Sequence, residues 1–353
     1  MCPGFFRIFG RMKKAKDIDF SFIIPVYNRA DELAELLASF VKTDKAKAAY
    51  EIIVADDGST EDIQAVVNRF SGLPVMYFRQ ANAGPGAARN AAMERAKGKY
   101  FVILDSDVLL PADYFEKLIE AVEKHPQAGM LGGSDASDSG FTAFQKAVDL
   151  TMTSLCTTGG IRGAKKQAGR FVPRSFNMVV RRDVWEQTGG FSDMHPGEDP
   201  QWVYRAWDAG FSTVAVPDLK VFHKRRINLR SFWRQVLRFG RARAILTRQF
   251  PRYFSPVYLA PVFFVLWTLL AITGPGFFRW TWVAYALCAF VEFLIRSPHP
   301  LLALEALFLM LVQHTGYALG FLQGWFKLFI LGKNPRQAFP GMFFAEKNKI
   351  KDA

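Results

Sequence analysis

Cysteine is scarce in this chain, and the N-terminus lacks the pattern of a secretory signal. The three cysteines, Cys2, Cys156 and Cys288, lie far apart in the sequence. Such a set provides neither a disulfide framework nor a zinc-binding spacing. Residues 1–19 form a basic segment whose apolar residues are interrupted by charge, so they make no continuous signal core. We therefore expect the domain that follows to stay in the cytoplasm.

Acidic residues are missing from the segment between Lys220 and Arg252, which carries eleven Lys or Arg residues. Nucleic acid and anionic lipid both attract a protein with a net charge of +13, so the position of the charge decides between them. The basic segment leads into two apolar stretches, 256–273 and 277–295, each long enough to span a bilayer core of ~30 Å. This arrangement predicts contact with anionic membrane headgroups and no binding of nucleic acid.

Segment 228–252 has the pattern of an amphipathic helix, with apolar residues on one side and arginines on the other. Such a helix is typical of the membrane interface, where its apolar face lies in lipid and its arginines meet phosphates. A surface helix packed on its own domain is the alternative. Because the segment runs directly into apolar stretches, the interface is the favoured interpretation.

Region 253–331 is predicted to contain two or three membrane spans. Its third apolar stretch, 301–331, is longer than a bilayer core and is broken by polar residues. Gly316, Gly320 and Gly324 recur at a spacing that offers a close helix-packing face. Three spans would place the tail, 332–353, outside, but its lysines favour the cytoplasm. The number of spans is therefore left open.

Residues 20–227 alternate short apolar runs with helical periodicity, which indicates one α/β domain. Strand and helix follow each other at a spacing that implies a Rossmann-like, mostly parallel sheet. Ligands of such sheets bind at the carboxyl ends of the strands. No Gly-x-Gly-x-x-Gly turn follows the first strand, 20–26, which argues against a dinucleotide-dependent redox enzyme.

Polar clusters stand at the ends of these apolar runs. Asp56 and Asp57 follow one expected strand, and Asp105 and Asp107 follow another. Asp-x-Asp offers the oxygen ligands that Mg²⁺ or Mn²⁺ prefers. The glycine turn 82–90 leads into a helix N-terminus, which suits an anion.

An acidic pair, Glu198 and Asp199, begins a helix framed by glycine and proline. A carboxylate held rigidly in such a turn suits a general base. The same pair could equally serve as a plain helix cap.

Taken in order, these clusters closely resemble glycosyltransferase family 2, whose members share the GT-A fold. The resemblance covers about residues 20–225. Six segments carry it: 23–28, 55–60, 82–90, 104–107, 189–191 and 197–199. It implies a metal-dependent, inverting hexosyl transfer from a nucleotide-sugar donor, with Mg²⁺ or Mn²⁺ as the cofactor.

The resemblance also implies roles for individual residues. Tyr27 would stack on the nucleotide base and Asp57 would bind its edge, while Asp107 would bind the metal ion with His223 as a further ligand. Asp199 would be the base that deprotonates the acceptor hydroxyl, with Glu198 beside it. The donor-binding set is Pro25, Tyr27, Asn28, Asp57, Asn82, Arg89 and Asp105.

Four residues are candidates for contacting the acceptor or the diphosphate: Trp202, Arg225, Gln235 and Arg238. The segment 235–239 resembles the Gln-x-x-Arg-Trp signature of processive polysaccharide synthases, with phenylalanine in place of tryptophan. That departure and the small number of spans favour transfer of a single sugar.

The sequence therefore predicts an enzyme of the cytoplasmic membrane, with its catalytic domain on the cytoplasmic side. Its expected acceptor is a hydroxyl of a lipid-linked or membrane-proximal glycan in envelope polysaccharide or glycolipid synthesis. A processive synthase and a non-catalytic nucleotide-binding membrane scaffold are the alternatives.

Overall fold

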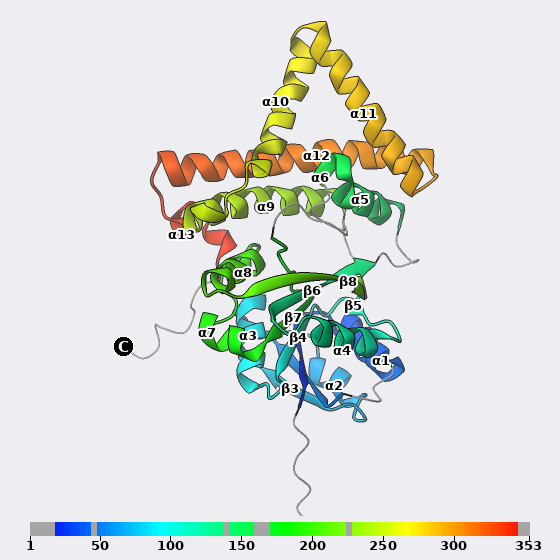
Figure 1. The fold of residues 1–353 in the computed structure, drawn as a ribbon, viewed down its shortest axis with the longest axis vertical. Coiled ribbons are helices and arrows are strands. Elements are labelled where there is room, and N and C mark those ends of the chain that lie inside the picture. Colours follow the sequence, from blue (N-terminus) through cyan, green and yellow to red (C-terminus); the bar gives the residue numbers. More distant parts are fainter. Residues whose placement is uncertain (1–17, 44–47, 137–141, 159–169, 224–227, 345–353) are drawn as a thin grey trace, which may run out of the picture.

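A computed structural model describes residues 18–43, 48–136, 142–158, 170–223 and 228–344. An α/β domain forms the lower part of the molecule in Figure 1, and long helices form the upper part. The sequence predictions for His223 and Arg225 fall partly outside this description: the side chain of His223 and the whole of Arg225 are not among the described atoms.

One eight-stranded sheet forms the centre of the α/β domain, in the order β3-β2-β1-β4-β7-β6-β8-β5. The neighbours from β3 to β4 run parallel, as do β6 and β8, whereas β7 and β5 run antiparallel to their neighbours. The predicted mostly parallel sheet is confirmed. The strands are β1 (Phe20–Val26), β2 (Tyr50–Asp56), β3 (Val75–Arg79), β4 (Tyr100–Leu104), β5 (Val108–Leu109), β6 (Ala128–Ala136), β7 (Asn177–Arg181) and β8 (Ser212–His223).

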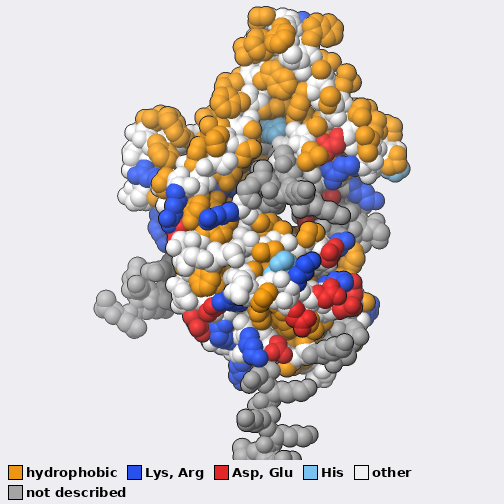
Figure 2. Space-filling model, viewed as in Figure 1, with side chains coloured by type: hydrophobic (Ala, Val, Ile, Leu, Met, Phe, Trp, Pro, Cys, Tyr) orange, Lys and Arg blue, Asp and Glu red, His pale blue; other side chains and the backbone are white. Residues whose placement is uncertain are grey.

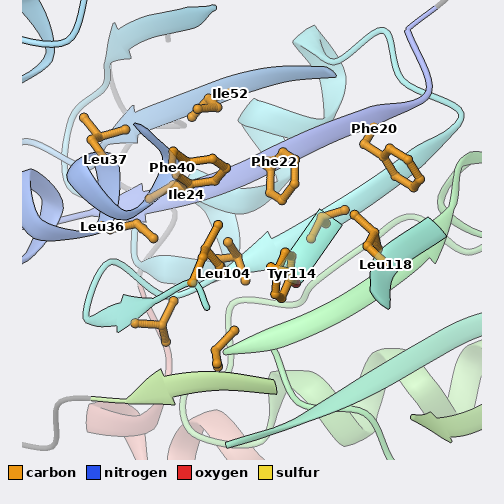
Figure 3. Packing of buried hydrophobic residues seen from close by; sticks show 14 of the residues in the cluster. Phe20, Phe22, Ile24, Leu36, Leu37, Phe40, Ile52, Leu104, Tyr114 and Leu118 are labelled. Carbon is orange, nitrogen blue, oxygen red and sulfur yellow. The ribbon is translucent and has the colours of Figure 1, made fainter. Parts of the chain in front are cut away.

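Helices cover both faces of the sheet, which is why its central strands are apolar throughout and not alternating. Phe22 and Ile24 point to one face, where they pack with Leu36, Phe40 and other helical residues (Figure 3). Ile23 points to the other face and packs in a second cluster. The helices of this domain are α1 (Ala30–Lys42), α2 (Ile63–Asn68), α3 (Pro85–Arg95), α4 (Tyr114–Lys124), α7 (Arg182–Thr188) and α8 (Glu198–Asp208).

Three helical segments are long and apolar enough to cross a membrane: 256–273, 276–296 and 300–330. The upper part contains α5 (Ala143–Thr153), α6 (Leu155–Thr158), α9 (Leu229–Gln249), α10 (Ala260–Thr273), α11 (Gly276–Arg296), α12 (Pro300–Trp325) and α13 (Pro335–Ala338). Helices α10 and α11 form a projecting hairpin, whereas α12 lies across its base and beside α9 (Figure 1). Apolar side chains cover the hairpin, and charged ones gather on the α/β domain (Figure 2).

Helices α9 and α12 pack along a seam of glycines. A β-carbon on Gly320 would lie 2.0 Å from the Leu237 carbonyl oxygen, and one on Gly240 would lie 2.1 Å from that of Tyr317. The predicted packing face at Gly316, Gly320 and Gly324 is therefore confirmed, and its partner is α9. The prediction that the apolar face of α9 lies in lipid is wrong, because α12 covers that face.

The far end of α11 holds α5 and α6 against the long apolar helices. Glu292 accepts hydrogen bonds from the Ser154 hydroxyl (2.7 Å) and from the backbone N–H groups of Leu155 (2.9 Å) and Cys156 (3.0 Å). These N–H groups belong to the first turn of α6, so Glu292 stabilises the positive end of that short helix. The segment 142–158 thus belongs structurally to the helical part of the molecule.

Candidate active site

The ends of β1 and β2 are tied together by Asn28. Its backbone N–H donates to the Ser59 hydroxyl (3.0 Å), and its side-chain oxygen accepts from the Thr60 backbone N–H (2.7 Å). Asn28 has a φ of 51°, a left-handed conformation that asparagine tolerates. The neighbouring Tyr27 is 49% exposed, so its ring is open to a ligand, whereas Pro25 is buried within β1.

Asp57 organises the glycine turn that follows β3. One carboxylate oxygen accepts from the Gln80 amide (2.8 Å) and the Ala83 backbone N–H (2.9 Å), and the other from the Gly84 backbone N–H (2.8 Å). Burial raises the pKa of Asp57, although these hydrogen bonds oppose the rise. Here its oxygens shape the turn that carries Asn82, and the contact of Asp57 with a nucleotide base stays a prediction.

Arg89 bridges the end of β4 and the start of α8. Its Nη2 lies 2.7 Å from Asp105 Oδ1, and its Nη1 lies 3.6 Å from Glu198 Oε1. The Arg89 side chain is only 5% exposed, and its Nε has no hydrogen-bond partner among the described atoms. Its guanidinium also lies 5.1 Å from the ring centre of Phe191. Burial opposes its charge, but the nearby Asp105, Asp199 and Glu198 raise the pKa of Arg89 overall.

Asp107 pairs with an arginine that the sequence did not single out. Arg29 Nη1 lies 2.6 Å from Asp107 Oδ2. Strand register pairs Val108, the next residue, with His223, so the backbones of the two predicted metal ligands run side by side. Among the side chains that the structure describes, no group of three or more His, Cys, Asp or Glu could hold a metal ion.

A divalent ion nevertheless fits the chemistry at Asp107. Mg²⁺ typically binds through one or two carboxylates and takes its remaining ligands from substrate phosphates and water. Asp107 supplies one carboxylate at the edge of the sheet, and the Arg29 side chain that pairs with it is 47% exposed. An exposed arginine can turn toward a diphosphate when an ion takes its place beside the carboxylate.

Asp199 has one oxygen held and one oxygen without a partner. The Ser175 backbone N–H donates to Oδ2 (3.2 Å), while Oδ1 is buried and has no hydrogen-bond partner in the described part of the chain. Burial and the charge of Glu198 raise the pKa of Asp199 to about 6, against the opposing charges of Arg89 and Arg174. Such a carboxylate is a stronger base than an exposed aspartate.

Glu198 stays ionised beside this base. Burial opposes its charge, but the hydrogen bond from His195 and the charges of His195 and Arg89 lower the pKa of Glu198. His195 Nδ1 lies 2.8 Å from Glu198 Oε1. Neighbouring carboxyl groups with pKa values moved in opposite directions suggest different roles, with Asp199 the better candidate for accepting a proton.

The loop that leads into α8 is clamped by the C-terminal strap, which we define as residues 335–344. The His195 backbone N–H donates to the Met342 oxygen (2.8 Å), and the Phe344 N–H donates to the Asp193 oxygen (3.0 Å). Met194 and Phe343 form an isolated antiparallel bridge. The strap therefore returns from the long apolar helices to the loop at the candidate active site.

The candidates for acceptor contact are placed differently from the prediction. Trp202 is fully buried and donates its indole N–H to the Thr188 hydroxyl (2.7 Å), so its assignment to the acceptor is wrong. Arg238 donates to the backbone oxygens of His195 (2.6 Å) and Gly341 (3.3 Å), which makes it a link between α9 and the strap. Gln235 lies exposed on α9.

Several residues at this site were not identified from the sequence. Arg29 and Phe344 enter through contacts between distant segments, for which no local pattern exists, whereas His195 lies only three residues before its partner Glu198. Asn90 was noted only as part of a motif, yet it both donates to and accepts from the backbone of Phe191 (2.8 and 2.9 Å). Its position one residue after Arg89 was the available signal.

Comparison with known proteins shows which family the α/β domain matches. Residues 21–188 match the model described as Glycosyl transferase family 2. Glycosyltransferase AglE of Haloferax volcanii is 27% identical over 213 residues, which are 58% of this chain and 67% of that protein. Succinoglycan biosynthesis protein ExoA of Rhizobium meliloti is 24% identical over 323 residues, 85% of this chain and 92% of that protein.

Other curated relatives match over a shorter region. Rickettsial and staphylococcal glycosyltransferases align over 109 to 113 residues, which are only 18 to 19% of their own length.

Among solved structures, mannosyltransferase PcManGT from Pyrobaculum calidifontis, in complex with GDP-Man and Mn²⁺, aligns with a TM-score of 0.62. The alignment covers 89% of this chain and 91% of that one at 17% identity, which supports the fold. Residues 21–188 thus belong to a glycosyltransferase family 2 domain with the GT-A fold, and long apolar C-terminal helices follow it.

Proposed function

We propose that this chain is a metal-dependent, inverting glycosyltransferase. It moves a hexose from a nucleoside-diphosphate sugar to a hydroxyl group of a lipid-linked or membrane-proximal acceptor. The observation that carries this proposal is the bridge made by Arg89, which contacts Asp105 at the end of β4 and Glu198 at the start of α8. Through this one side chain, the edge of the sheet that suits a donor and the helix that carries a base belong to the same site.

Asp199 is the base in this mechanism. Its buried Oδ1 accepts the proton of the acceptor hydroxyl, while the Ser175 N–H fixes the direction of the carboxylate through Oδ2. With a pKa of about 6, the group is mostly ionised at neutral pH but holds a proton more readily than an exposed aspartate. Attack assisted by one base, with the diphosphate leaving on the other side, inverts the anomeric carbon.

The donor is held by the ends of β1, β3 and β4. Tyr27 offers an exposed ring for the nucleotide base, and Asp105 faces the ribose from its pairing with Arg89. Asp57 acts on the donor indirectly, because it shapes the turn that carries Asn82. A divalent ion at Asp107, Mg²⁺ or Mn²⁺, would neutralise charge that develops on the departing diphosphate.

The relatives support both the donor class and the pathway class. PcManGT was solved with GDP-Man and Mn²⁺, and the name of ExoA assigns it to succinoglycan biosynthesis. Synthesis of an envelope polysaccharide or glycolipid fits these similarities. Transfer of a single sugar remains our proposal, since Gln235 lies exposed on α9 and Arg238 serves as a tether.

The membrane arrangement proposed here has two crossings, α10 and α11. The strap pairs with the α/β domain at Met194, so the chain returns to the side from which α10 departed. An even number of crossings satisfies this, and α12 can lie along the membrane surface beside α9. The basic residues of 220–252 favour the cytoplasmic side for the catalytic domain.

The test uses purified full-length protein and a panel of nucleotide sugars. Binding of the right donor should raise the unfolding temperature only when Mg²⁺ or Mn²⁺ is present. Asp107→Asn should abolish the effect of the metal ion on donor binding. Asp199→Asn should leave donor binding intact and lower turnover by about 10²- to 10⁴-fold. Normal turnover in folded Asp199→Asn would refute the assignment of the base.

A further inference from the structure

Arg174 lies within electrostatic range of the proposed base, Asp199. It directly precedes Ser175, whose N–H holds Asp199 Oδ2. The half-buried guanidinium lies within electrostatic range of Asp199 and of a second arginine, Arg243. Within the described residues it makes neither a hydrogen bond nor an ion pair. Burial and the charge of Arg243 lower the pKa of Arg174, against the opposing charges of Asp199 and Glu198.

Arg243 continues the positive charge toward the membrane helices. From α9 it donates Nη1 to the Tyr204 hydroxyl (2.9 Å), and its guanidinium lies 3.9 Å from the ring centre of Tyr258. The hydroxyl of Tyr317 on α12 is also within electrostatic range. These partners are neutral, and no carboxylate in the described part of the chain forms an ion pair with Arg243. The two guanidinium groups thus lie within electrostatic range of each other, and Arg243 makes no ion pair with a described carboxylate, so Asp199 and Glu198 act on the pair only from the Arg174 side.

An apolar groove of about 400 Å³ includes Thr247 of α9, one helical turn after Arg243. Its lining comes from α9, the start of α10 and the end of α12. The main contributors are Thr247, Leu259, Val262, Phe321, Leu322 and Trp325. Leu322 and Trp325 are 46% and 45% exposed, so the groove opens on the surface of the apolar helices.

The groove is continuous with the surroundings of Arg243. Thr247 lies one helical turn after Arg243 and donates its hydroxyl to the Arg243 carbonyl oxygen (2.8 Å). Leu259 directly follows Tyr258. Phe321 lies one turn after Tyr317, and the two rings stack with centres 6.3 Å apart. A ligand that contacts Arg243 can therefore extend directly into apolar surroundings.

We propose that Arg174, Arg243 and this groove form the acceptor subsite, and that the acceptor is a sugar carried on a lipid through a phosphate group. The hydroxyl that reacts lies at Asp199, the phosphate at the two arginines, and the hydrocarbon chain in the groove. The inference rests on the proposed function, because it takes Asp199 as the base.

The order of the three chemical environments is the argument for this substrate class. Guanidinium groups bind phosphate oxygens through paired, charge-assisted hydrogen bonds, and two of them suit a doubly charged group. A groove of this volume is within the range of ligand pockets, and its apolar lining fits a hydrocarbon chain. A free sugar would use neither feature, and a free phosphate would use only the first.

The test uses the full-length protein in amphipol and three probes: decyl phosphate, decanol and inorganic phosphate. Tryptophan fluorescence reports binding, because Trp325 lines the groove. Decyl phosphate should bind at least about tenfold more tightly than decanol or inorganic phosphate, since it alone uses both parts of the site. Butyl phosphate, with its shorter chain, should bind more weakly than decyl phosphate without any change to the protein.

Substitutions distinguish binding by these two arginines from a general effect of positive charge on the protein. Arg174→Gln and Arg243→Gln should each bring decyl phosphate to the affinity of decanol. Arg234→Gln, an exposed arginine on the same helix α9, should have no effect. Unchanged binding in a folded Arg174→Gln variant, or equal binding of decanol and decyl phosphate by the parent, would overturn the proposal. The chain-length comparison remains decisive if Arg243→Gln does not fold.

Two further arms identify the source of the phosphate and separate this inference from the function on which it rests. If phosphatidylglycerol displaces decyl phosphate at equal concentration, the site holds ordinary anionic lipid and the acceptor proposal fails. Metal-dependent stabilisation by the nucleotide sugar is measured on the same samples. Donor binding without binding of decyl phosphate refutes only the acceptor subsite, whereas binding of decyl phosphate without metal-dependent binding of any donor refutes the proposed function.

Discussion

The aromatic ring of Phe344 lies directly against Gly84, so close that a β-carbon on Gly84 would come within 2.3 Å of it. Gly84 precedes α3 in the turn that Asp57 organises, and Phe344 ends the strap that clamps His195. This contact joins the donor side of the site to the segment that returns from the membrane helices. The turn at Gly84 and the loop before the proposed base therefore both contact Phe344.

Gly84→Ala should lower the free energy of unfolding by about 1–3 kcal/mol, because the φ of 94° and ψ of 163° are almost restricted to glycine. Thermal unfolding measures the loss. In a Phe344→Ala background the steric part of the cost should disappear and the backbone part should remain. Gly72→Ala is the matched control, since nothing lies within 4 Å of that position. Equal costs of Gly84→Ala in both backgrounds would show that the ring does not press on the turn.

Transfer should depend on pH through the ionisation of Asp199. Only the carboxylate accepts a proton, and its pKa is raised to about 6 by burial and by Glu198. We expect kcat/KM to rise about tenfold per pH unit below this value and to level off above it. A profile that is flat between about pH 5 and 7 would rule out Asp199 as the base that limits the rate.

Glu198→Gln should move the acid limb of that profile to lower pH. The negative charge of Glu198 is the second cause of the raised pKa of Asp199, so its removal makes Asp199 easier to ionise. Glutamine keeps an oxygen to accept the hydrogen bond from His195. Glu186→Gln, an exposed residue on the neighbouring helix α7, should leave the profile in place. A shift to higher pH in Glu198→Gln would contradict the proposed coupling.

Gly320→Ala should destabilise the helical part by about 1–3 kcal/mol through overpacking. The added β-carbon would lie 2.0 Å from the Leu237 carbonyl oxygen, which is backbone and cannot turn away. Gly276→Ala is the control, because that helical glycine in α11 has open space around it. Thermal unfolding in the same detergent compares the two, and equal stability would show that the seam is loose.

The sheet and most of the candidate site could be predicted because their signals are local. Each strand is a short apolar run, and the polar residues that follow it, such as Asp105, emerge at one edge once the strands run parallel. The glycine seam was also predictable, since Gly316, Gly320 and Gly324 recur about once per helical turn. Their spacing revealed a close contact but not the partner helix.

Two errors have a common physical cause: the sequence shows that a side chain is apolar but not which group will cover it. The apolar face of α9 has the same pattern whether lipid or α12 covers it. Trp202 follows the acidic pair on α8, where an aromatic ring could face a sugar, yet it fills the core beside Phe191. Burial decides such cases, and burial depends on segments distant in the sequence.

Contacts of the strap were beyond prediction for a different reason. Nothing near Phe344 indicates that this residue meets Gly84, since the contact forms only after α12 has brought the chain back. Likewise, Arg29 directly follows the first motif, but its pairing with Asp107 depends on how far β1 and β4 extend. Such relations follow from topology, and a single sequence contains no direct signal for them.

The close approach of α9 and α12 also limits where this chain can be truncated. A fragment ending at Gln249 would expose Phe232 and Val236, which are now almost fully covered, and would release Arg238 from Gly341. The soluble fragment usually sought for crystallography would thus lose its own support for the loop before the base. Purification with the hairpin and strap intact is the route to an active preparation.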